Sequence, residues 1–166
     1  IEKRFKNGEL YSADSIHFAD SLKYQTLRRH RTVYGGGGIM PDEFVPLDTT
    51  QFTKLHRQIV ARSLIINATL RYVDQHRTEL KSRYTNFDDY IANYKVPQAM
   101  IDSIFAEAEH LKLKPYTKEE RDKTLPMLTL QLKALIARDI WDMNEYYRIM
   151  NESNRIVAKA VEIAGK

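Results

Sequence analysis

Four consecutive glycines between Gly35 and Gly38 form the segment that most directly suggests chemistry, because glycine-rich loops can hold phosphate groups with backbone amides. A phosphate-binding loop also needs a lysine and a hydroxyl residue after the glycines, at the start of a helix. Here the glycines lead into Ile39-Met40-Pro41-Asp42 and another extended segment, so we expect no nucleotide and no other cofactor. The run instead predicts a close-packed strand end or a loop that lines a groove. The residues assigned to this groove or structural turn are Gly35, Gly36, Gly37, Gly38, Pro41 and Asp42.

Side chains that bind metals or attack carbonyl groups are scattered along the sequence. No two of the five histidines have the four-residue spacing of a zinc-binding helix. No serine is flanked by the small residues that place a nucleophile at a sharp, exposed turn, and Ser63 and Ser103 fall within apolar helical stripes. The acidic pair Asp88-Asp89 follows Asn86 at an expected helix start, where carboxylates complement the helix dipole. The sequence therefore predicts no metal site and no catalytic residue.

Aromatic residues near the C-terminus allow two interpretations. Trp141, Tyr146 and Tyr147 could line a ligand pocket, or they could anchor one helix against its neighbour. Anchoring is the more common role of such rings, and it is the interpretation we favour.

The elements that would position these residues change in character near Asp48. Before it, Tyr24 to Tyr34 alternates and is rich in Thr and Tyr, which predicts a strand. Glu43 to Leu47, with Pro41 before it and Pro46 within it, predicts an edge strand or an extended connector. From Thr49 onward the apolar residues recur every three or four positions, which predicts helices, with Thr49 or Thr50 as the first N-cap.

Local signals divide the helical part into about five helices. One buried stripe is predicted at Phe52, Leu55, Ile59, Ser63, Ile66, Leu70 and Val73, in one bent helix or two helices that end near Tyr84. Asn86 caps a short helix up to Tyr94, and Pro97 begins the next one. Thr117 and Glu120 form a capping box, and Pro126 kinks or restarts the helix that follows. The last helix is predicted from the stripe Tyr146, Ile149, Ser153, Ile156, Ala160 and Ile163, with Gly165 as its stop.

Composition and charge are ordinary for a globular domain. The 166 residues are 43% hydrophobic and 29% charged, and they include no cysteine. A net charge of +4 is mild, and the only tight basic run, Arg28 to Arg31, is better explained as a solvated strand or turn than as a nucleic-acid site. The chain begins at Ile1 with no methionine, which indicates a processed piece with targeting information upstream. We predict a mainly α fold, with a β-like arm over residues 1–48 and a helical domain over residues 49–166.

The segment RTVYGGGGIMPDEFVPLDTT, Arg31 to Thr50, closely resembles the end of the protease domain in carboxyl-terminal processing (tail-specific) serine proteases, most of all the Bacteroides-type envelope forms. Three further segments look like the same proteases: NGEL at residues 7–10, LKALIARDIW at residues 132–141 and EYYRIMNESNRIVAKAVEI at residues 145–163. The resemblance spans nearly the whole chain. His30 departs from it, because these proteases commonly have glycine there.

Proteases of this family use a serine in a small-residue motif, a lysine base and a PDZ domain that recruits unstructured C-termini of substrate proteins. These elements precede the glycine segment in the family, and this chain has no matching positions for them. The resemblance therefore implies the last strands of a catalytic sheet and a helical extension, inactive alone, in the periplasm or cell envelope. Its implied partners are the catalytic and PDZ domains of the same protease chain, or a second copy through self-association.

Two alternatives come from other classes of protein. The chain could be a helical module that binds a partner protein, which would require an exposed apolar stripe. It could also bind nucleic acid through Arg28 to Arg31, which the mild net charge disfavours.

Overall fold

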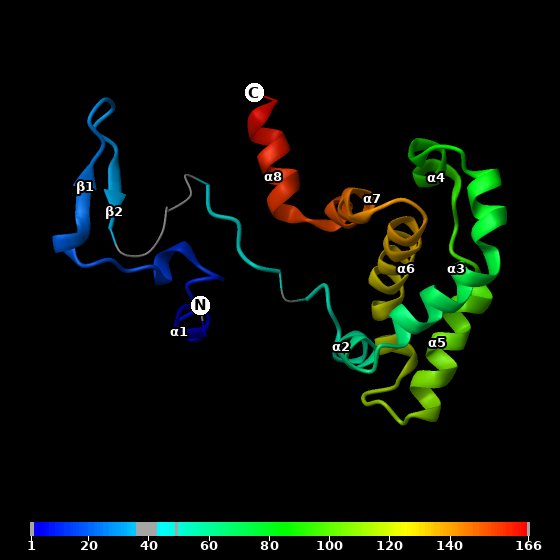
Figure 1. The fold of residues 1–166 in the computed structure, drawn as a ribbon. Coiled ribbons are helices and arrows are strands. Elements are labelled where there is room, and N and C mark those ends of the chain that lie inside the picture. Colours follow the sequence, from blue (N-terminus) through cyan, green and yellow to red (C-terminus); the bar gives the residue numbers. More distant parts are fainter. Residues whose placement is uncertain (1, 36–42, 49, 166) are drawn as a thin grey trace. The chain divides into compact units, whose positions relative to one another are not determined.

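The computed structural model describes residues 2–35, 43–48 and 50–165, and the chain is mainly helical with one short two-stranded antiparallel sheet (Figure 1). It forms two compact units, Ile1–Asp48 and Thr49–Lys166. Within the described residues, no helix is both long enough and apolar enough to cross a membrane.

The N-terminal unit is built around a hairpin. It contains α1 (Glu2–Lys6), two 3-10 turns (Ala13–Ser15 and Asp20–Leu22), β1 (Lys23–Gln25) and β2 (Thr32–Tyr34). The prediction of a single strand over residues 24–34 is wrong, because the chain reverses between Thr26 and Arg31. There the Thr26 amide donates to the Arg31 carbonyl at 3.0 Å, and the Arg31 amide donates to the Thr26 hydroxyl at 3.0 Å. The basic run lies in this exposed turn, where His30 has a φ of 47°.

Residues 43–48 are a connector and carry no strand hydrogen bonding in the described part of the unit. Within this segment, the Leu47 amide donates to the Leu10 carbonyl at 2.9 Å. No described side chain of this unit is buried, and Tyr24, Leu27 and Val33 of the hairpin are 57%, 96% and 42% exposed. Phe18 stacks on Tyr34 of β2 with ring centroids 4.5 Å apart, but a two-stranded sheet without a buried hydrophobic face is marginally stable at best. The N-terminal unit therefore has no core of its own among the residues described.

The C-terminal unit consists of helices packed on one another (Figure 1). Its elements are α2 (Lys54–Ala61), α3 (Leu64–Arg83), α4 (Phe87–Asn93), α5 (Gln98–His110), α6 (Lys118–Ile140), α7 (Met143–Met150), a 3-10 turn (Asn151–Ser153) and α8 (Arg155–Ala164). The long helices α3 and α6 pack against each other, α5 lies beside α3, α2 touches both α3 and α6, and α7 packs on α6.

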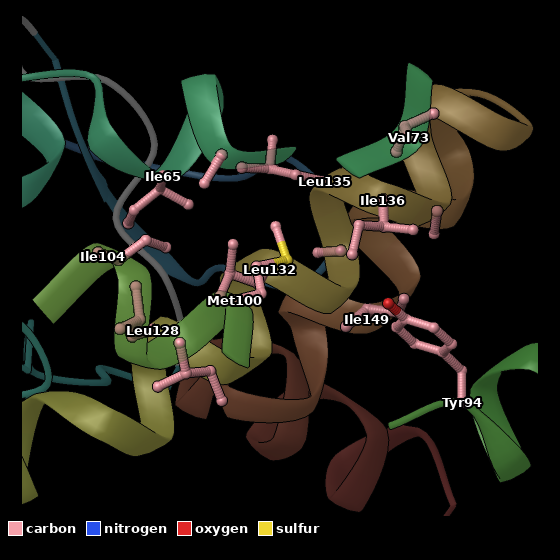
Figure 2. Close-up of a cluster of buried hydrophobic side chains, with 14 of the residues drawn as sticks. Ile65, Val73, Tyr94, Met100, Ile104, Leu128, Leu132, Leu135, Ile136 and Ile149 are labelled. Atoms are coloured by element: carbon pink, nitrogen blue, oxygen red, sulfur yellow. The ribbon is translucent and has the colours of Figure 1, made fainter. Parts of the chain in front are cut away.

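One hydrophobic core joins the helices from α2 to α7 (Figure 2). One face of α6 lies in this core, since Leu128, Leu132 and Ile136 have no exposed surface and Leu135 is 6% exposed. Close packing of such side chains makes each large-to-small change costly. The core residues labelled in Figure 2 are Ile65, Val73, Tyr94, Met100, Ile104, Leu128, Leu132, Leu135, Ile136 and Ile149.

The predicted stripe from Phe52 to Val73 is interrupted at Ser63. Leu55 and Ile59 of α2 are fully buried, but Ile66 and Leu70 of α3 are 38% and 46% exposed. Ser63 has a left-handed backbone, with φ 58° and ψ 21°, and it separates the two helices. The break rotates α3, so its buried face is instead Ile65, Ala68, Thr69, Val73 and Leu80.

Replacing Ser63 with glycine is expected to raise the free energy of unfolding by about 0.5–1 kcal/mol. A left-handed backbone costs a residue with a side chain roughly 1–2 kcal/mol, and the Ser63 side chain makes no cap hydrogen bond that would be lost. Urea denaturation provides the measurement. The matched control is Ser103→Gly inside α5, which should lower stability by about 0.5–1 kcal/mol. Equal destabilisation by both changes would contradict the left-handed conformation at Ser63.

The last predicted stripe also spans a break. Tyr146 and Ile149 lie in α7, whereas Ile156, Ala160 and Ile163 lie in α8, after the turn Asn151–Ser153. Asn154 starts α8 with its side-chain oxygen, which accepts from the Ile156 and Val157 amides at 3.0 and 3.3 Å. The prediction of a single helix is therefore wrong. The polar run Asn-Glu-Ser-Asn after Met150 favours the start of a new capped helix over continuation of α7.

Helix starts were predicted well where a capping side chain acts locally. Asn86 caps α4 as expected, with its Oδ1 accepting from the Asp89 amide at 2.9 Å. Helix α2 starts later than predicted, because its N-cap is Thr53 rather than Thr50. The other predicted N-cap, Thr49, lies outside the described residues. Helix α6 runs through Pro126 without restarting.

The predicted capping box at the start of α6 is half formed. The Thr117 hydroxyl accepts from the Glu120 amide at 3.2 Å, as the box requires. The Glu120 carboxylate, however, accepts from the Leu55 amide at 3.2 Å. This carboxylate therefore satisfies a free amide at the start of α2 and ties α6 to that helix.

Candidate functional site

The predicted glycine site is described only at its first residue. The Gly35 amide donates to the Leu22 carbonyl at 2.8 Å and extends the hairpin ladder. A Cβ atom on Gly35 would lie 2.9 Å from Cε2 of Tyr24, so a larger residue here would displace that ring. The remaining residues of the prediction lie outside the described part of the chain: Gly36, Gly37, Gly38, Pro41 and Asp42.

Two of the three aromatic residues near the C-terminus pack as helix anchors. Trp141, at the end of α6, contacts the rings of Phe87 and Tyr90 in α4 edge-on, with centroids 5.8 and 5.2 Å away. Tyr146 packs against the core and Tyr147 is 57% exposed. Anchoring is therefore the role of Trp141 and Tyr146, whereas the exposed Tyr147 does not anchor a helix.

Tyrosines from α4 and its flanks extend this aromatic cluster. Tyr90 stacks on Tyr94 with centroids 4.6 Å apart, and Tyr84 meets both rings edge-on. The Tyr90 hydroxyl donates to the Lys133 carbonyl at 2.9 Å, and Lys133 Nζ donates to the Ile91 carbonyl at 2.6 Å. Burial raises the pKa of the Tyr90 and Tyr94 phenols, so both stay neutral.

No catalytic constellation is found among the described residues. Within residues 2–35, 43–48 and 50–165, no group of three or more histidine, aspartate or glutamate side chains is placed to hold a metal ion. Ser103 Oγ donates to the Met100 carbonyl at 2.8 Å, a bond within its own helix. Asp88 pairs with Arg148 at 3.1 Å, which joins α4 to α7.

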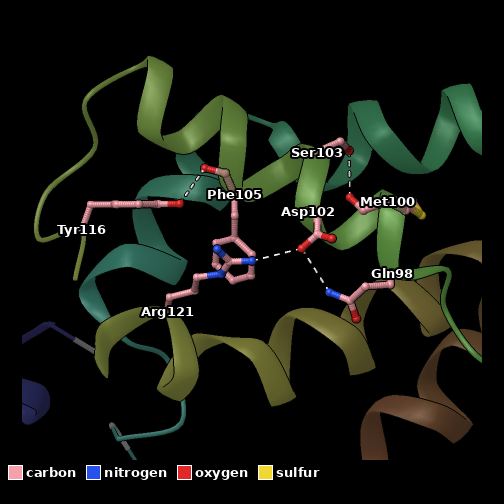
Figure 3. Close-up of polar contacts among 7 residues, drawn as sticks. All are labelled: Gln98, Met100, Asp102, Ser103, Phe105, Tyr116 and Arg121. Atoms are coloured by element: carbon pink, nitrogen blue, oxygen red, sulfur yellow. Dashed lines mark hydrogen bonds and ion pairs between the residues drawn. The ribbon is translucent and has the colours of Figure 1, made fainter. Parts of the chain in front are cut away.

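A polar network holds α5 against α6 (Figure 3). Asp102 accepts from Arg121 Nη2 at 3.0 Å and from Gln98 Nε2 at 3.1 Å. The Arg121 guanidinium lies 4.6 Å from the centroid of the Phe105 ring, and the Tyr116 hydroxyl donates to the Phe105 carbonyl at 3.1 Å. These contacts occupy the α6 side of α5 and leave its other side facing α3.

A groove between α3 and α5 is the strongest candidate for a binding site. Its middle section has a volume of about 510 Å³ and lies between Arg71–Glu79 of α3 and Pro97–Ser103 at the start of α5. Smaller hollows of about 350 and 230 Å³ continue it at the two ends. The first hollow and the middle section share Arg71 and Ser103. The middle section and the last hollow share Tyr72, Glu79 and Pro97. The groove therefore follows most of the length of α3.

The floor of this groove is apolar and its α3 wall is polar. Ala68, Met100 and Ile104 form buried parts of the floor, and Tyr72 stacks on His76 with centroids 4.3 Å apart. The wall is a row of exposed side chains four residues apart: Asn67, Arg71, Gln75, Glu79 and Arg83. Residues at this spacing lie on one line along a helix. Sequence reasoning missed the groove, although this polar row beside Ala68 and Tyr72 was a usable signal.

His56 is a buried titratable residue apart from the groove. It is 1% exposed, and its Nε2 lies 3.0 Å from Gln131 Oε1. Since that oxygen accepts only, Nε2 carries the proton in this pair and Nδ1 is left buried without a partner in the part described. Burial lowers the pKa of His56, and the bond to Gln131 opposes this shift in part. A neutral imidazole is therefore the form that fits the core.

Acidification is expected to destabilise the helical unit through His56. The normal pKa of a histidine is 6.5, and below this pH the unfolded chain protonates His56 whereas the folded chain resists protonation. The free energy of unfolding therefore falls as the pH decreases below 6.5. Urea denaturation at pH 7.5 and pH 5.5 tests this, with His56→Asn as the comparison. The variant should lose less stability between the two pH values than the native chain does. An equal loss of stability in both proteins would contradict the role of His56 in this pH dependence.

The last helix leaves its apolar side uncovered. Ile156, Val161 and Ile163 of α8 are 56%, 66% and 41% exposed, and no residue of α8 is buried. The contacts of α8 within its unit are chiefly with the preceding 3-10 turn. This exposed helix is the second surface in the unit that is available for binding.

Comparison with known proteins identifies a family without an assigned role. The model of a family of unknown function, DUF8443, matches residues 55–142, which is more than half of the chain and runs from α2 to just beyond the end of α6. No curated protein and no solved structure matches the chain. The chain therefore belongs to the DUF8443 family.

Proposed function

We propose that this chain is the C-terminal region of a serine-type carboxyl-terminal processing endopeptidase and is not catalytic by itself. In that enzyme the hairpin β1–β2 adds to the sheet of the catalytic domain. The helical unit braces that sheet, shapes the substrate groove or mediates self-association. The catalytic serine and lysine, and the PDZ domain, belong to other parts of the same protein.

The observation that carries this proposal is the lack of buried side chains among the described residues of the N-terminal unit. Its exposed Tyr24, Leu27 and Val33 would gain from contact with a neighbouring apolar surface. Each strand of the hairpin also has an outer edge that pairs with no other strand in the described part of the chain, and such an edge can pair with a further strand. The segment from Arg31 to Thr50 also resembles protease sequences. This resemblance supplies the rest of the proposal, which is that the substrates are unstructured protein C-termini and that the location is the periplasm or envelope.

A peptidase assay and the gene sequence test the proposal together. The 166-residue chain alone should not cleave an unstructured peptide. The codons upstream of Ile1 should encode a serine among small residues, followed by a lysine. Cleavage by the isolated chain that a serine-directed inhibitor blocks would contradict the proposal, and so would an upstream sequence without the serine and lysine.

A second candidate is a helical module that binds a partner protein, and the exposed apolar side of α8 favours it. Such a surface should bind an apolar dye or associate in solution. Light scattering combined with dye fluorescence measures both. A monodisperse monomer with no dye binding would remove this candidate and leave the first one standing.

A further inference from the structure

The α3–α5 groove has the dimensions of a site for a short polypeptide segment. Its polar row runs from Asn67 to Arg83, which corresponds to about 24 Å along the helix at ~1.5 Å per residue. An extended chain advances about 3.3 Å per residue, so roughly seven residues would fill the groove. A helix of the same residue count would cover less than half of this length.

The side chains of the polar row are available for hydrogen bonding. In the described part of the chain, the side chains of Asn67, Arg71, Gln75 and Glu79 make no hydrogen bond or ion pair with the protein. The amides of Asn67 and Gln75 each offer a donor and an acceptor, which is the combination that a peptide group presents. They lie two helical turns apart on either side of Arg71.

This chemistry favours an extended occupant. A helix pairs its own backbone groups internally, whereas an extended segment leaves each N–H and C=O group in need of a partner. Side-chain amides can supply such partners along the row. The apolar floor at Tyr72, Met100 and Ile104 can cover one small or aliphatic side chain of the occupant.

Charge distinguishes the two ends of the groove. At the end near α4, the charged residues among the described lining are Arg83, Lys95 and Glu79, which leaves an excess of positive charge. At the other end, Arg71 and Glu107 lie in the same hollow and balance each other. An occupant with carboxylate side chains at one end complements this pattern.

We propose that the α3–α5 groove binds an extended segment of another polypeptide, with acidic side chains placed at Arg83 and Lys95. Asn67 and Gln75 hold its backbone, and the floor covers an aliphatic side chain near its middle. The inference stands apart from the proposed protease role, because it concerns only the helical unit and its test measures binding without cleavage.

Fluorescence anisotropy with a defined probe tests the inference. The probe is a labelled, end-blocked ten-residue peptide of serine and alanine with a central leucine and two aspartates at one end. It should bind the 166-residue chain saturably, and its affinity should fall at least about tenfold when the aspartates are replaced by lysines. A lack of saturable binding, or equal affinity for both peptides, would overturn the proposal.

Groove variants locate the binding. Arg83→Glu combined with Lys95→Glu should reverse the preference, so that the lysine peptide binds more tightly than the aspartate peptide. Asn67→Ala combined with Gln75→Ala should weaken both peptides by about tenfold. The matched control, Arg57→Glu with Lys81→Glu, makes the same charge change at exposed residues that do not line the groove. If the control reverses the preference equally, binding is a net-charge effect and the groove assignment fails.

Discussion

Replacing Tyr90 with alanine is expected to lower the free energy of unfolding by about 3–5 kcal/mol. Tyr90 has no exposed surface, and its ring packs against Tyr84, Tyr94 and Trp141 with centroids 5.4, 4.6 and 5.2 Å away. Removing the ring leaves a cavity at the point where α4 meets the end of α6. Denaturation by urea, followed by circular dichroism, measures the loss.

Two further substitutions separate packing from hydrogen bonding in this cluster. Tyr90→Phe keeps the ring but leaves the Lys133 carbonyl without the hydroxyl donor, which should cost about 1 kcal/mol. Tyr147→Ala removes a tyrosine that is 57% exposed and should change stability by less than about 0.5 kcal/mol. If Tyr147→Ala costs as much as Tyr90→Ala, the aromatic cluster is not the anchor described here.

Replacing Ile149 with alanine is expected to cost about 2–5 kcal/mol, whereas the same change at Ile156 should cost less than about 0.5 kcal/mol. The two isoleucines are seven residues apart and belong to one predicted stripe. Ile149 in α7 has no exposed surface, but Ile156 in α8 is 56% exposed. The difference between the two values measures the effect of the break at Asn151–Ser153 directly.

The same pair of variants also bears on oligomeric state. Equal losses from Ile149→Ala and Ile156→Ala, independent of protein concentration, would mean that α8 is packed within its own chain. A loss at Ile156 that grows with protein concentration would mean that a second copy covers α8, as self-association in the proposed function allows. Denaturation curves at two protein concentrations, tenfold apart, distinguish these outcomes.

Much of the helical fold follows from local sequence signals. Asn86 and Thr117 each satisfy a free amide within their own first turn, so neighbouring residues are enough to place those helix starts. The stripe of α6 is also readable, because Leu128, Leu132 and Ile136 keep one face through Pro126. In these places local preference and tertiary packing agree.

The errors lie where apolar spacing continues across a break in the chain. Ile149, Ser153 and Ile156 keep helical spacing, yet Asn154 starts a new helix. Ser63 has the same effect between α2 and α3 through its left-handed backbone, which is uncommon for a residue with a side chain. Spacing shows which residues share a face, but it does not show whether another element covers that face.

The candidate groove could not be derived in the same way. Its walls come from α3 and from the start of α5, which are separated by the whole of α4. Only packing brings Arg71 and Ser103 to the same hollow. The glycine site, by contrast, was predicted from the sequence, but its residues beyond Gly35 lie outside the part of the chain described.

Amide hydrogen exchange on the 166-residue chain tests the central claim that the N-terminal unit needs a neighbour to complete its fold. The hairpin amides in β1 and β2 should exchange about as fast as those of an unfolded chain, because no side chain described in the N-terminal unit is buried. Amides in the middle of α3 and α6 should exchange only through global unfolding of the helical unit. Hairpin amides as protected as those of α3 and α6 would show a core within residues 1–48 and would contradict the account.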